Sequence, residues 1–236
     1  MVVVLAKQKG GVGATTAAVS LAVEAMGRGL RTLLVDADPQ RTASVWGEVA
    51  AEQGRPAPTV VGMAGAMHRA DQLPALAEGH DLVVVDLPPR LEAVTRSALM
   101  VADVVLLPSG GSAADVWALG DVVRLVDEAR TLRPDLPVAV LLTRAQTNTA
   151  MGRAARSVLE ESGLPVLRAS LGFRVTYAEA LAAGQGPTTY APRSEAADEV
   201  RRLLTEVLAL GGPPDASRKA PRRVPPTPKA SPARRS

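Results

Sequence analysis

A glycine-rich segment near the amino terminus contains the residue types of a phosphate-binding loop. The stretch KQKGGVGATT, residues 7–16, follows an apolar run and precedes a stretch with a helical pattern. Backbone N–H groups of such a loop, and of the first helical turn, point together at a bound anion. The phosphate-loop pattern G-x-x-x-x-G-K-[ST] places a lysine before the hydroxyl residue, and Ala14 stands there in this chain. The segment therefore predicts phosphate binding with one positive charge missing.

The glycines and Thr15 each have a specific use in such a loop. Gly10, Gly11 and Gly13 let the backbone turn tightly and approach phosphate oxygens without interference from a Cβ. Thr15, at the start of the expected helix, can offer its hydroxyl to Mg²⁺ and its N–H to a phosphate. Glycines alone are a weak signal, and a plain strand-to-helix turn is the alternative.

Acidic residues stand at the ends of two other apolar runs. Asp86 ends the run DLVVVD, where an unused charge would be costly, and holding a Mg²⁺ hydration shell is its expected role. Asp36 and Asp38 follow a second run, so one could orient an attacking water while the other supports the metal. The alternatives are a helix N-cap for Asp86 and surface turns for the other two.

Alternating apolar runs and helical patterns predict the fold that positions these residues. The expected strands are 2–6, 32–35, 81–85, 103–107, 138–142 and 165–167, and the expected helices are 15–26, 42–52, 91–101, 114–132, 149–162, 176–183 and 195–210. Strands that alternate with helices imply right-handed crossovers and a parallel sheet covered on both faces. We therefore expect a doubly wound, mainly parallel α/β sheet, with ligands beyond the carboxyl ends of its strands.

The composition of the 236 residues narrows the class of protein. The chain is long enough for one α/β domain with a full core, which we place at residues 1–212. It has no cysteine, which excludes disulfides, thiolate metal sites and iron–sulfur clusters, and its two distant histidines do not suggest a zinc site. No apolar run approaches the roughly 20 residues that cross a bilayer, and Met1 passes into a strand without a basic leader. A cytoplasmic location is therefore expected.

Basic charge is concentrated in residues 213–236. That segment has seven basic residues, seven prolines and one acidic residue, Asp215, whereas the net charge of the whole chain is +3. With almost no apolar side chains it cannot bury enough surface to offset its ordering entropy, so we predict a disordered basic tail. The candidate contacts to DNA phosphates are Arg193, Arg201 and Arg202 near the last helix and Arg218, Lys219, Arg222 and Arg223 in the tail. A solvated surface is the alternative for all of them.

Five segments, in order, resemble one known family. KGGVGATT, LLVDADPQRT, DLVVVDLPPR, ADVVLLPSGGSAADVWAL and a late segment that begins RVTYAEALAAGQGPTTY are similar to the deviant Walker-A ATPases of the ParA/MinD group. The similarity is greatest to the short ParA branch, which lacks an N-terminal helix-turn-helix domain, and it runs from about Val2 to Leu210. It implies an ATP-dependent homodimer that positions plasmids, chromosomes or other large cargo on the nucleoid. It also implies nonspecific binding to double-stranded DNA and a small ParB-like or cargo-adaptor partner that stimulates hydrolysis.

The resemblance also implies roles for individual residues. Lys9 resembles the signature lysine that reaches the nucleotide of the partner subunit. Asp38 is similar to the first-switch aspartate needed for hydrolysis, and with Thr15 and the Walker-B aspartate, Asp86, it belongs to the implied Mg²⁺ site. The implied ATP contacts are Lys9, Gly10, Gly11, Val12, Gly13, Ala14, Thr15, Thr16, Thr143 and Arg144, of which the last two lie beside the base.

Ala14 is the departure from the family pattern. Losing a point charge aimed at the developing phosphoryl charge should cost about 3 kcal/mol of transition-state stabilisation, while backbone N–H groups, Mg²⁺ and the helix dipole remain for binding. Lys9 could supply a cation from the partner subunit. Two functions stay open: a ParA-like ATPase with impaired turnover, and a nonhydrolysing scaffold in which ATP only changes the oligomeric state. A membrane-surface function of the MinD type is disfavoured, because prolines interrupt the tail and it has no apolar face.

Aromatic residues make up 2% of the chain, which argues against a stacking platform for single-stranded nucleic acid. Tyr177 has no base nearby in the sequence, so we expect it to pack rather than to act in catalysis. Trp117 is expected in the core or on a dimer surface.

Overall fold

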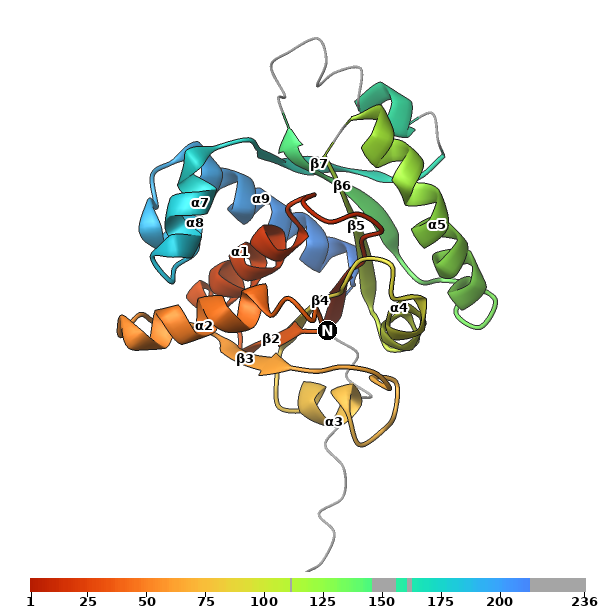
Figure 1. Cartoon of the computed structure of the whole chain (residues 1–236), viewed down its shortest axis with the longest axis horizontal. Helices are drawn as coiled ribbons and strands as arrows, with labels where there is room; N and C mark the ends of the chain where they lie inside the picture. Colours follow the sequence, from red (N-terminus) through yellow and green to blue (C-terminus); the bar gives the residue numbers. More distant parts are fainter. Residues whose placement is uncertain (111, 146–155, 161–162, 213–236) are drawn as a thin grey trace, which may run out of the picture.

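The computed structural model describes residues 1–110, 112–145, 156–160 and 163–212, and its centre is a seven-stranded sheet (Figure 1). The strand order is β3-β2-β4-β1-β5-β6-β7, and every neighbouring pair is parallel. The strands are β1 (Val2–Leu5), β2 (Thr32–Asp36), β3 (Thr59–Gly62), β4 (Leu82–Asp86), β5 (Val104–Ser109), β6 (Val138–Ala145) and β7 (Val166–Gly172). The expected doubly wound, parallel α/β fold is confirmed.

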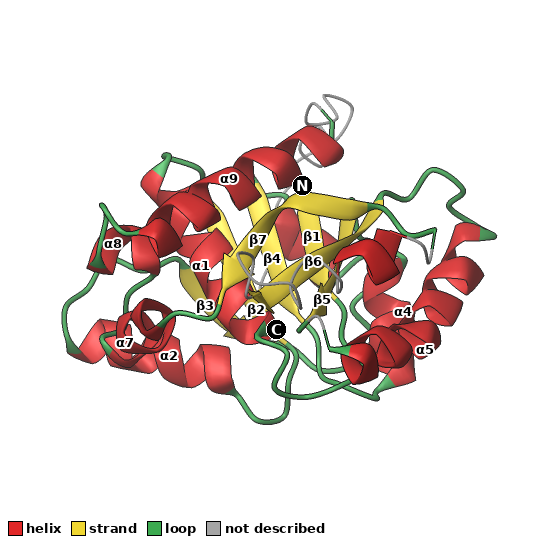
Figure 2. Ribbon diagram, turned by 90° about the horizontal axis from the view of Figure 1, so that it is seen from above, coloured by secondary structure: helices red, strands yellow, loops and turns green. Residues whose placement is uncertain are grey.

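Helices cover both faces of this sheet. They are α1 (Ala14–Gly27), α2 (Thr42–Glu52), α3 (Leu73–Ala77), α4 (Glu92–Leu99), α5 (Ala113–Arg130), α7 (Val175–Ala182), α8 (Pro187–Tyr190) and α9 (Glu195–Leu210), and residues 156–160 are also helical. Figure 2 shows α1, α2, α7 and α9 on one side of the sheet and α4 and α5 on the other. Within the described ranges, no helix has the length and apolar character needed to cross a membrane.

Each central strand is a continuous apolar run because both of its faces are buried. In β1, Val3 and Leu5 pack into the core beneath α1 and α9. Val2 and Val4 pack into the other core, beneath α4 and α5, since successive side chains of a strand point to opposite faces. Packing on both sides holds the sheet in place, so it supports the loops at its carboxyl edge.

Three short elements were not predicted from the sequence, and the last strand is longer than predicted. β3 is an edge strand of four residues with exposed ends, and it is a strand because it pairs with β2. α3 and α8 have five and four residues, too few to show a helical period. β7 continues to Gly172 because its later residues pair with β6 across register shifts. Of the expected helix 149–162, residues 149–155 and 161–162 lie outside the described residues.

The register brings the ends of three strands side by side. β1 lies between β4 and β5, where the strand order changes direction, and ligands bind at such a point in open parallel sheets. Leu5 of β1 and Asp36 of β2 both pair with Asp86 of β4. Residues that follow β1 and β2 therefore lie next to Asp86, although they are far from it in the sequence.

Candidate phosphate-binding site

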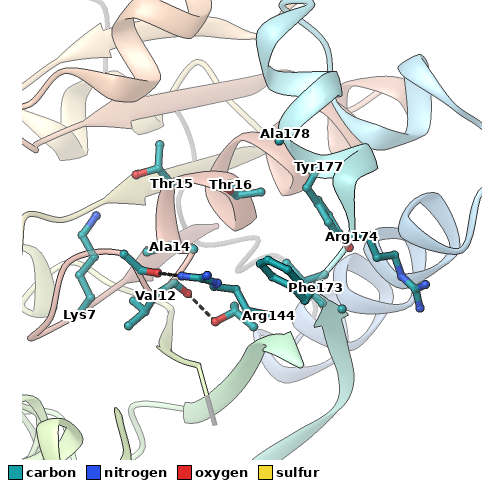
Figure 3. Close-up of a pocket in the computed structure, with 15 residues that line it drawn as sticks. Lys7, Val12, Ala14, Thr15, Thr16, Arg144, Phe173, Arg174, Tyr177 and Ala178 are labelled. Atoms are coloured by element: carbon teal, nitrogen blue, oxygen red, sulfur yellow. Dashed lines mark hydrogen bonds between the residues drawn. The ribbon is translucent and has the colours of Figure 1, made fainter. Parts of the chain in front are cut away.

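The loop between β1 and α1 borders an open cavity of about 380 Å³ (Figure 3). Gly11 and Gly13 both have a φ of 77°, in the left-handed region that favours glycine. A Cβ placed on Gly10 or Gly11 would meet no atom within 4 Å, so there is free space beside the loop backbone. α1 begins at Ala14 without a side-chain cap, which leaves the first N–H groups of the helix to an anion. The loop therefore fits a phosphate group.

Thr15 and Asp86 meet beside this loop. The Thr15 hydroxyl donates to Oδ2 of Asp86 at 2.5 Å, and Asp86 is fully buried. Burial raises the pKa of the Asp86 carboxyl, while the Lys7 ammonium and the hydrogen bond from Thr15 oppose that rise. A hydroxyl and a carboxylate are oxygen ligands of the kind that Mg²⁺ takes, together with water and phosphate oxygens. The pair therefore fits a magnesium ion at the phosphate site.

Lys7 is a site residue that was not predicted from the sequence. Its ammonium lies 2.9 Å from Oδ1 of Asp86 and 3.3 Å from Oδ2 of Asp38, and its side chain is only 6% exposed. The available signal was its position: Lys7 follows the carboxyl end of β1, where polar residues of a parallel sheet gather. One lysine thus joins two aspartates that come from different strand ends.

Asp36 and Asp38 have different surroundings. The buried carboxylate of Asp36 accepts hydrogen bonds from the Ser44 N–H at 2.7 Å, the Ser44 hydroxyl at 2.8 Å and the Asp38 N–H at 3.1 Å. These bonds connect the end of β2 to the first turn of α2, so Asp36 has a structural role. Asp38 instead contacts Lys7 and lines a hollow next to the glycine loop.

Lys9 pairs with Asp115 at the start of α5. The distance from Nζ to Oδ1 is 3.0 Å, and the lysine side chain is 48% exposed. Asp115 also completes a capping box with Ser112. Burial raises the pKa of the Asp115 carboxyl, but hydrogen bonds from Ser112 and Lys9 outweigh this effect and hold the pKa below its usual range. Lys9 is therefore accessible from outside while it is held by its own chain.

Thr143 and Arg144, near the end of β6, contact the glycine loop. The buried Thr143 hydroxyl lies 2.5 Å from the carbonyl oxygen of Val12. Nη1 of Arg144 donates to the carbonyl oxygen of Gly11 at 2.9 Å, and the guanidinium lies 5.1 Å from the centre of the Phe173 ring. Figure 3 shows Arg144 and Phe173 at the cavity, whose lining also includes Ala14, Thr16, Thr143 and Tyr177. The expected contacts of Thr143 and Arg144 with a base stay a prediction.

Backbone strain marks the same edge of the sheet. In the ranges that the structure describes, the non-glycine residues with positive φ are Arg41 at 55°, Arg90 at 61° and Arg144 at 51°. They follow or end β2, β4 and β6 on the side where the cavity lies. Such conformations cost about 1–3 kcal/mol each and gather at functional sites.

The arginines of the last helix lie among acidic residues. Arg201 pairs with Asp198 at 2.7 Å and donates to the carbonyl oxygen of Pro192 at 2.8 Å. Arg193 and Arg202 are exposed. The acidic residues of α9 are Glu195, Asp198, Glu199 and Glu206. The tail candidates Arg218, Lys219, Arg222 and Arg223 lie outside the described residues.

Tyr177 and Trp117 have opposite environments. Tyr177 is buried in the core beneath α1 and α9 and donates its hydroxyl to Oε2 of Glu199 at 2.8 Å, so its expected packing role is confirmed. Trp117, on α5, is 79% exposed, which excludes it from the core of its own protomer. A dimer surface stays the prediction for Trp117.

The amino-acid sequence is similar to those of known proteins. A family model described as the CobQ/CobB/MinD/ParA nucleotide binding domain matches residues 3–188. The chain is 32% identical over 206 residues to the maintenance of carboxysome distribution protein A of Halothiobacillus neapolitanus, a match that covers 86% of this chain and 94% of that protein. It is 31% identical over 236 residues to the chromosome-partitioning ATPase Soj of Thermus thermophilus, with 88% and 95% covered.

Solved structures have the same fold. A Cyanothece McdA variant in complex with ATP matches with a TM-score of 0.71 at 18% identity, over 89% of this chain and 96% of that one. The septum site-determining protein MinD of Pyrococcus horikoshii, complexed with Mg-ADP, matches with a TM-score of 0.70 at 19% identity, over 89% and 97%. At these identities the likeness shows the arrangement of strands and helices.

Proposed function

The chain belongs to the CobQ/CobB/MinD/ParA nucleotide-binding family, and we propose that it binds ATP with Mg²⁺ in the cavity beside its glycine loop. The observation that carries this proposal is that Asp38 and Asp86 both contact Lys7 at that loop, while Thr15 donates to Asp86. Relatives of the chain distribute carboxysomes or partition chromosomes, as their names state. We propose that this chain likewise forms a homodimer with ATP and positions a large cargo.

In this proposal the residues of the site have separate roles. Backbone N–H groups of residues 10–16 hold phosphate oxygens, and the Thr15 hydroxyl and Asp86 carboxylate hold the metal. When bound, Mg²⁺ neutralises part of the phosphate charge. Asp38 orients a water for hydrolysis, and Lys9 reaches the nucleotide of the partner subunit. Thr143 and Arg144 hold the loop and stand beside the base.

We propose that the protein is located in the cytoplasm and associates with the nucleoid. Residues 1–212 form the nucleotide-binding domain, and residues 213–236 add seven basic residues that bind double-stranded DNA without sequence preference. Arg193 and Arg202 add phosphate contacts, whereas Arg201 is already paired. A small ParB-like or cargo-adaptor protein stimulates the release of the dimer from DNA.

Ala14 favours a second candidate function. The position that carries a lysine in the phosphate-loop pattern is a buried alanine at the start of α1. A scaffold that binds ATP without turnover, and changes only its oligomeric state, needs the cradle but not that lysine.

Three measurements on the purified full-length chain test these functions. Calorimetric titration measures ATP affinity with and without Mg²⁺, light scattering measures dimer formation, and phosphate release measures turnover. ATP binding with dimer formation and phosphate release supports the ATPase, and binding with dimer formation but no phosphate release supports the scaffold. An absence of binding at about 1 mM nucleotide would contradict both.

A further inference from the structure

We propose that Lys7 provides, within its own chain, the phosphate-facing positive charge that position 14 lacks. The inference rests on the proposed ATP site and adds one residue to it. Ala14 stands where the phosphate-loop pattern has its lysine, and Lys7 stands at the opposite end of the same loop, two residues after the end of β1. The charge is therefore moved across the loop rather than lost.

The burial of Lys7 shows that its charge is used. Moving an ammonium group out of water is costly unless charged partners compensate. The Lys7 side chain is almost completely buried and is held by carboxylate oxygens at 2.9 and 3.3 Å. Its neighbours in the chain, Leu5 and Ala6, are fully buried apolar residues, so an apolar side chain would have continued the core without that cost. Interactions of the charge, not packing, account for a lysine at this position.

Lys7 also lies where phosphates of a nucleotide would be bound. It lines the cavity of Figure 3 together with Gly13, Ala14 and Thr16. It lines the adjoining hollow as well, together with Gly10 and Asp38. In Figure 3 its ammonium lies on the Thr15 side of the loop, whereas Phe173 lies at the opposite end of the cavity. Lys7 therefore borders two of the hollows beside the glycine loop, whereas Lys9 lines a third.

One of the two partners of Lys7, Asp86, is also a proposed magnesium ligand. Asp86, with Thr15, is the proposed metal ligand, so a metal ion and the Lys7 ammonium compete for the same carboxylate. A lysine ammonium sits on a flexible four-carbon stem and can turn toward a new anion. Lys7 then exchanges its carboxylate for phosphate oxygens in the cavity that it already lines, and forms a charge-assisted hydrogen bond there.

The other cations that line this cavity or the hollow beside Lys9 are held by groups away from the proposed metal ligands. Arg144 donates to the carbonyl oxygen of Gly11 and lies over Phe173. Lys9 pairs with Asp115. Arg174 pairs with Glu199 at 2.8 Å. Among these cations, Lys7 is the one that contacts Asp86.

The test compares ATP and AMP affinities of the full-length wild type with those of Lys7→Met, Ala14→Lys and the double variant, all with Mg²⁺. Lys7→Met should weaken ATP binding by roughly tenfold or more, because a charge-assisted hydrogen bond to phosphate is lost. AMP affinity should change by less than about threefold, because AMP lacks the outer phosphates. The double variant should regain ATP affinity to within about threefold of the wild type, and Ala14→Lys alone should change it by less than about threefold.

Several results would overturn the inference. Unchanged ATP affinity in Lys7→Met would show that the Lys7 ammonium does not contribute to ATP binding. Weak ATP binding by the double variant would show that a lysine at position 14 cannot replace Lys7. A tenfold gain from Ala14→Lys alone would mean that the charge is missing rather than moved. Loss of the preference for ATP over AMP in Arg144→Met, but not in Lys7→Met, would assign the role to Arg144.

Two controls keep the outcomes separate. A wild-type chain that binds no ATP contradicts the proposed function itself and not only the role of Lys7. Circular dichroism checks folding, since Lys7→Met leaves Asp38 and Asp86 without their cation. If Lys7→Met does not fold, Lys7→Gln takes its place, because it removes the charge but keeps a hydrogen-bond donor for the carboxylates.

Discussion

Lys9 and Asp115 form an ion pair within one chain, with the ammonium nitrogen 3.0 Å from Oδ1 of the carboxylate. In the proposed dimer the same lysine reaches the nucleotide of the partner subunit, so this pair has to break first. A pair in which the lysine side chain is 48% exposed contributes little, about 0–1 kcal/mol, because water already solvates the ammonium. The pair therefore positions Lys9 without strongly opposing its release.

Lys9→Ala should abolish the dimer that forms with ATP while the monomer still binds nucleotide. Because the Lys9 side chain is 48% exposed, the loss of its ion pair should leave the melting temperature nearly unchanged. Light scattering with Mg²⁺ and ATP, combined with calorimetric titration, checks both parts. Arg69→Ala is the control, since it removes an exposed basic side chain that pairs with Asp71 at 3.3 Å. Dimer formation by Lys9→Ala equal to that of the wild type would exclude this lysine from the interface.

Thr15→Val should remove the dependence of ATP affinity on Mg²⁺. Valine has nearly the shape of threonine but no hydroxyl to offer as a metal ligand, so affinity with Mg²⁺ should fall about tenfold, toward that measured in EDTA. Titrations with Mg²⁺ and with EDTA measure the difference. Thr15→Ser keeps the hydroxyl and should behave like the wild type. If Thr15→Val keeps the full magnesium effect, the hydroxyl does not bind the metal.

Gly184→Ala should destabilise the fold more than Gly54→Ala does. Both glycines have positive φ, 63° and 61°, which costs an alanine about 1–2 kcal/mol. At Gly184 the added Cβ would also lie 2.6 Å from Cα of Ala50, whereas at Gly54 it meets nothing within 4 Å. Overpacking should therefore lower the free energy of unfolding by about a further 1–3 kcal/mol in Gly184→Ala but not in Gly54→Ala. Urea unfolding measures both variants, and equal losses would show that α2 moves aside without cost.

The free energy of unfolding should decrease at alkaline pH because of Tyr177. Burial, and next the Glu199 carboxylate, raise the pKa of Tyr177 above its ordinary value of 10.0. The unfolded chain releases the phenol proton near pH 10 and the folded chain does not. The contribution of the protonated Tyr177 phenol to the free energy of unfolding is therefore fully present below about pH 10. It is lost as the pH rises above that value.

Urea unfolding of the wild type and Tyr177→Phe between about pH 8 and pH 11 isolates this effect. Tyr177→Phe should be about 1 kcal/mol less stable near pH 8, where a hydrogen bond to Glu199 is lost, and should fall less steeply above pH 10. Tyr190→Phe is the control, because Tyr190 is 41% exposed. Parallel curves for the wild type and Tyr177→Phe would refute the buried phenol as the cause.

Truncation after Gly212 should weaken binding to duplex DNA and reduce its dependence on salt. Each neutralised phosphate releases a counterion, so the full chain should lose affinity steeply as salt rises. ATP should strengthen DNA binding by the full chain, because a dimer has two tails. Salt titrations of both chains, with and without ATP, measure these effects. Equal affinities would remove residues 213–236 from the interface and leave Arg193 and Arg202 as candidates.

Local patterns were sufficient to predict the parallel sheet and the phosphate loop. Fully buried strands such as β1 and β4 have to be continuous apolar runs, and a tight turn into α1 needs glycines, so both features depend on neighbours along the chain. β3 was not predicted, because this half-exposed edge strand is formed by its pairing with β2 and not by a local apolar pattern.

The sequence by itself determined which residue types reach the carboxyl edge of the sheet: a glycine loop, Thr15, and aspartates at two strand ends. Only the tertiary structure decided their partners. It gave the two neighbouring aspartates different partners: Asp36 accepts a hydrogen bond from Ser44 at the start of α2, and Asp38 contacts Lys7. It also brought Lys7 within 2.9 Å of Asp86. These contacts depend on the order β2-β4-β1, because strands that are distant along the chain become neighbours only when the sheet is assembled.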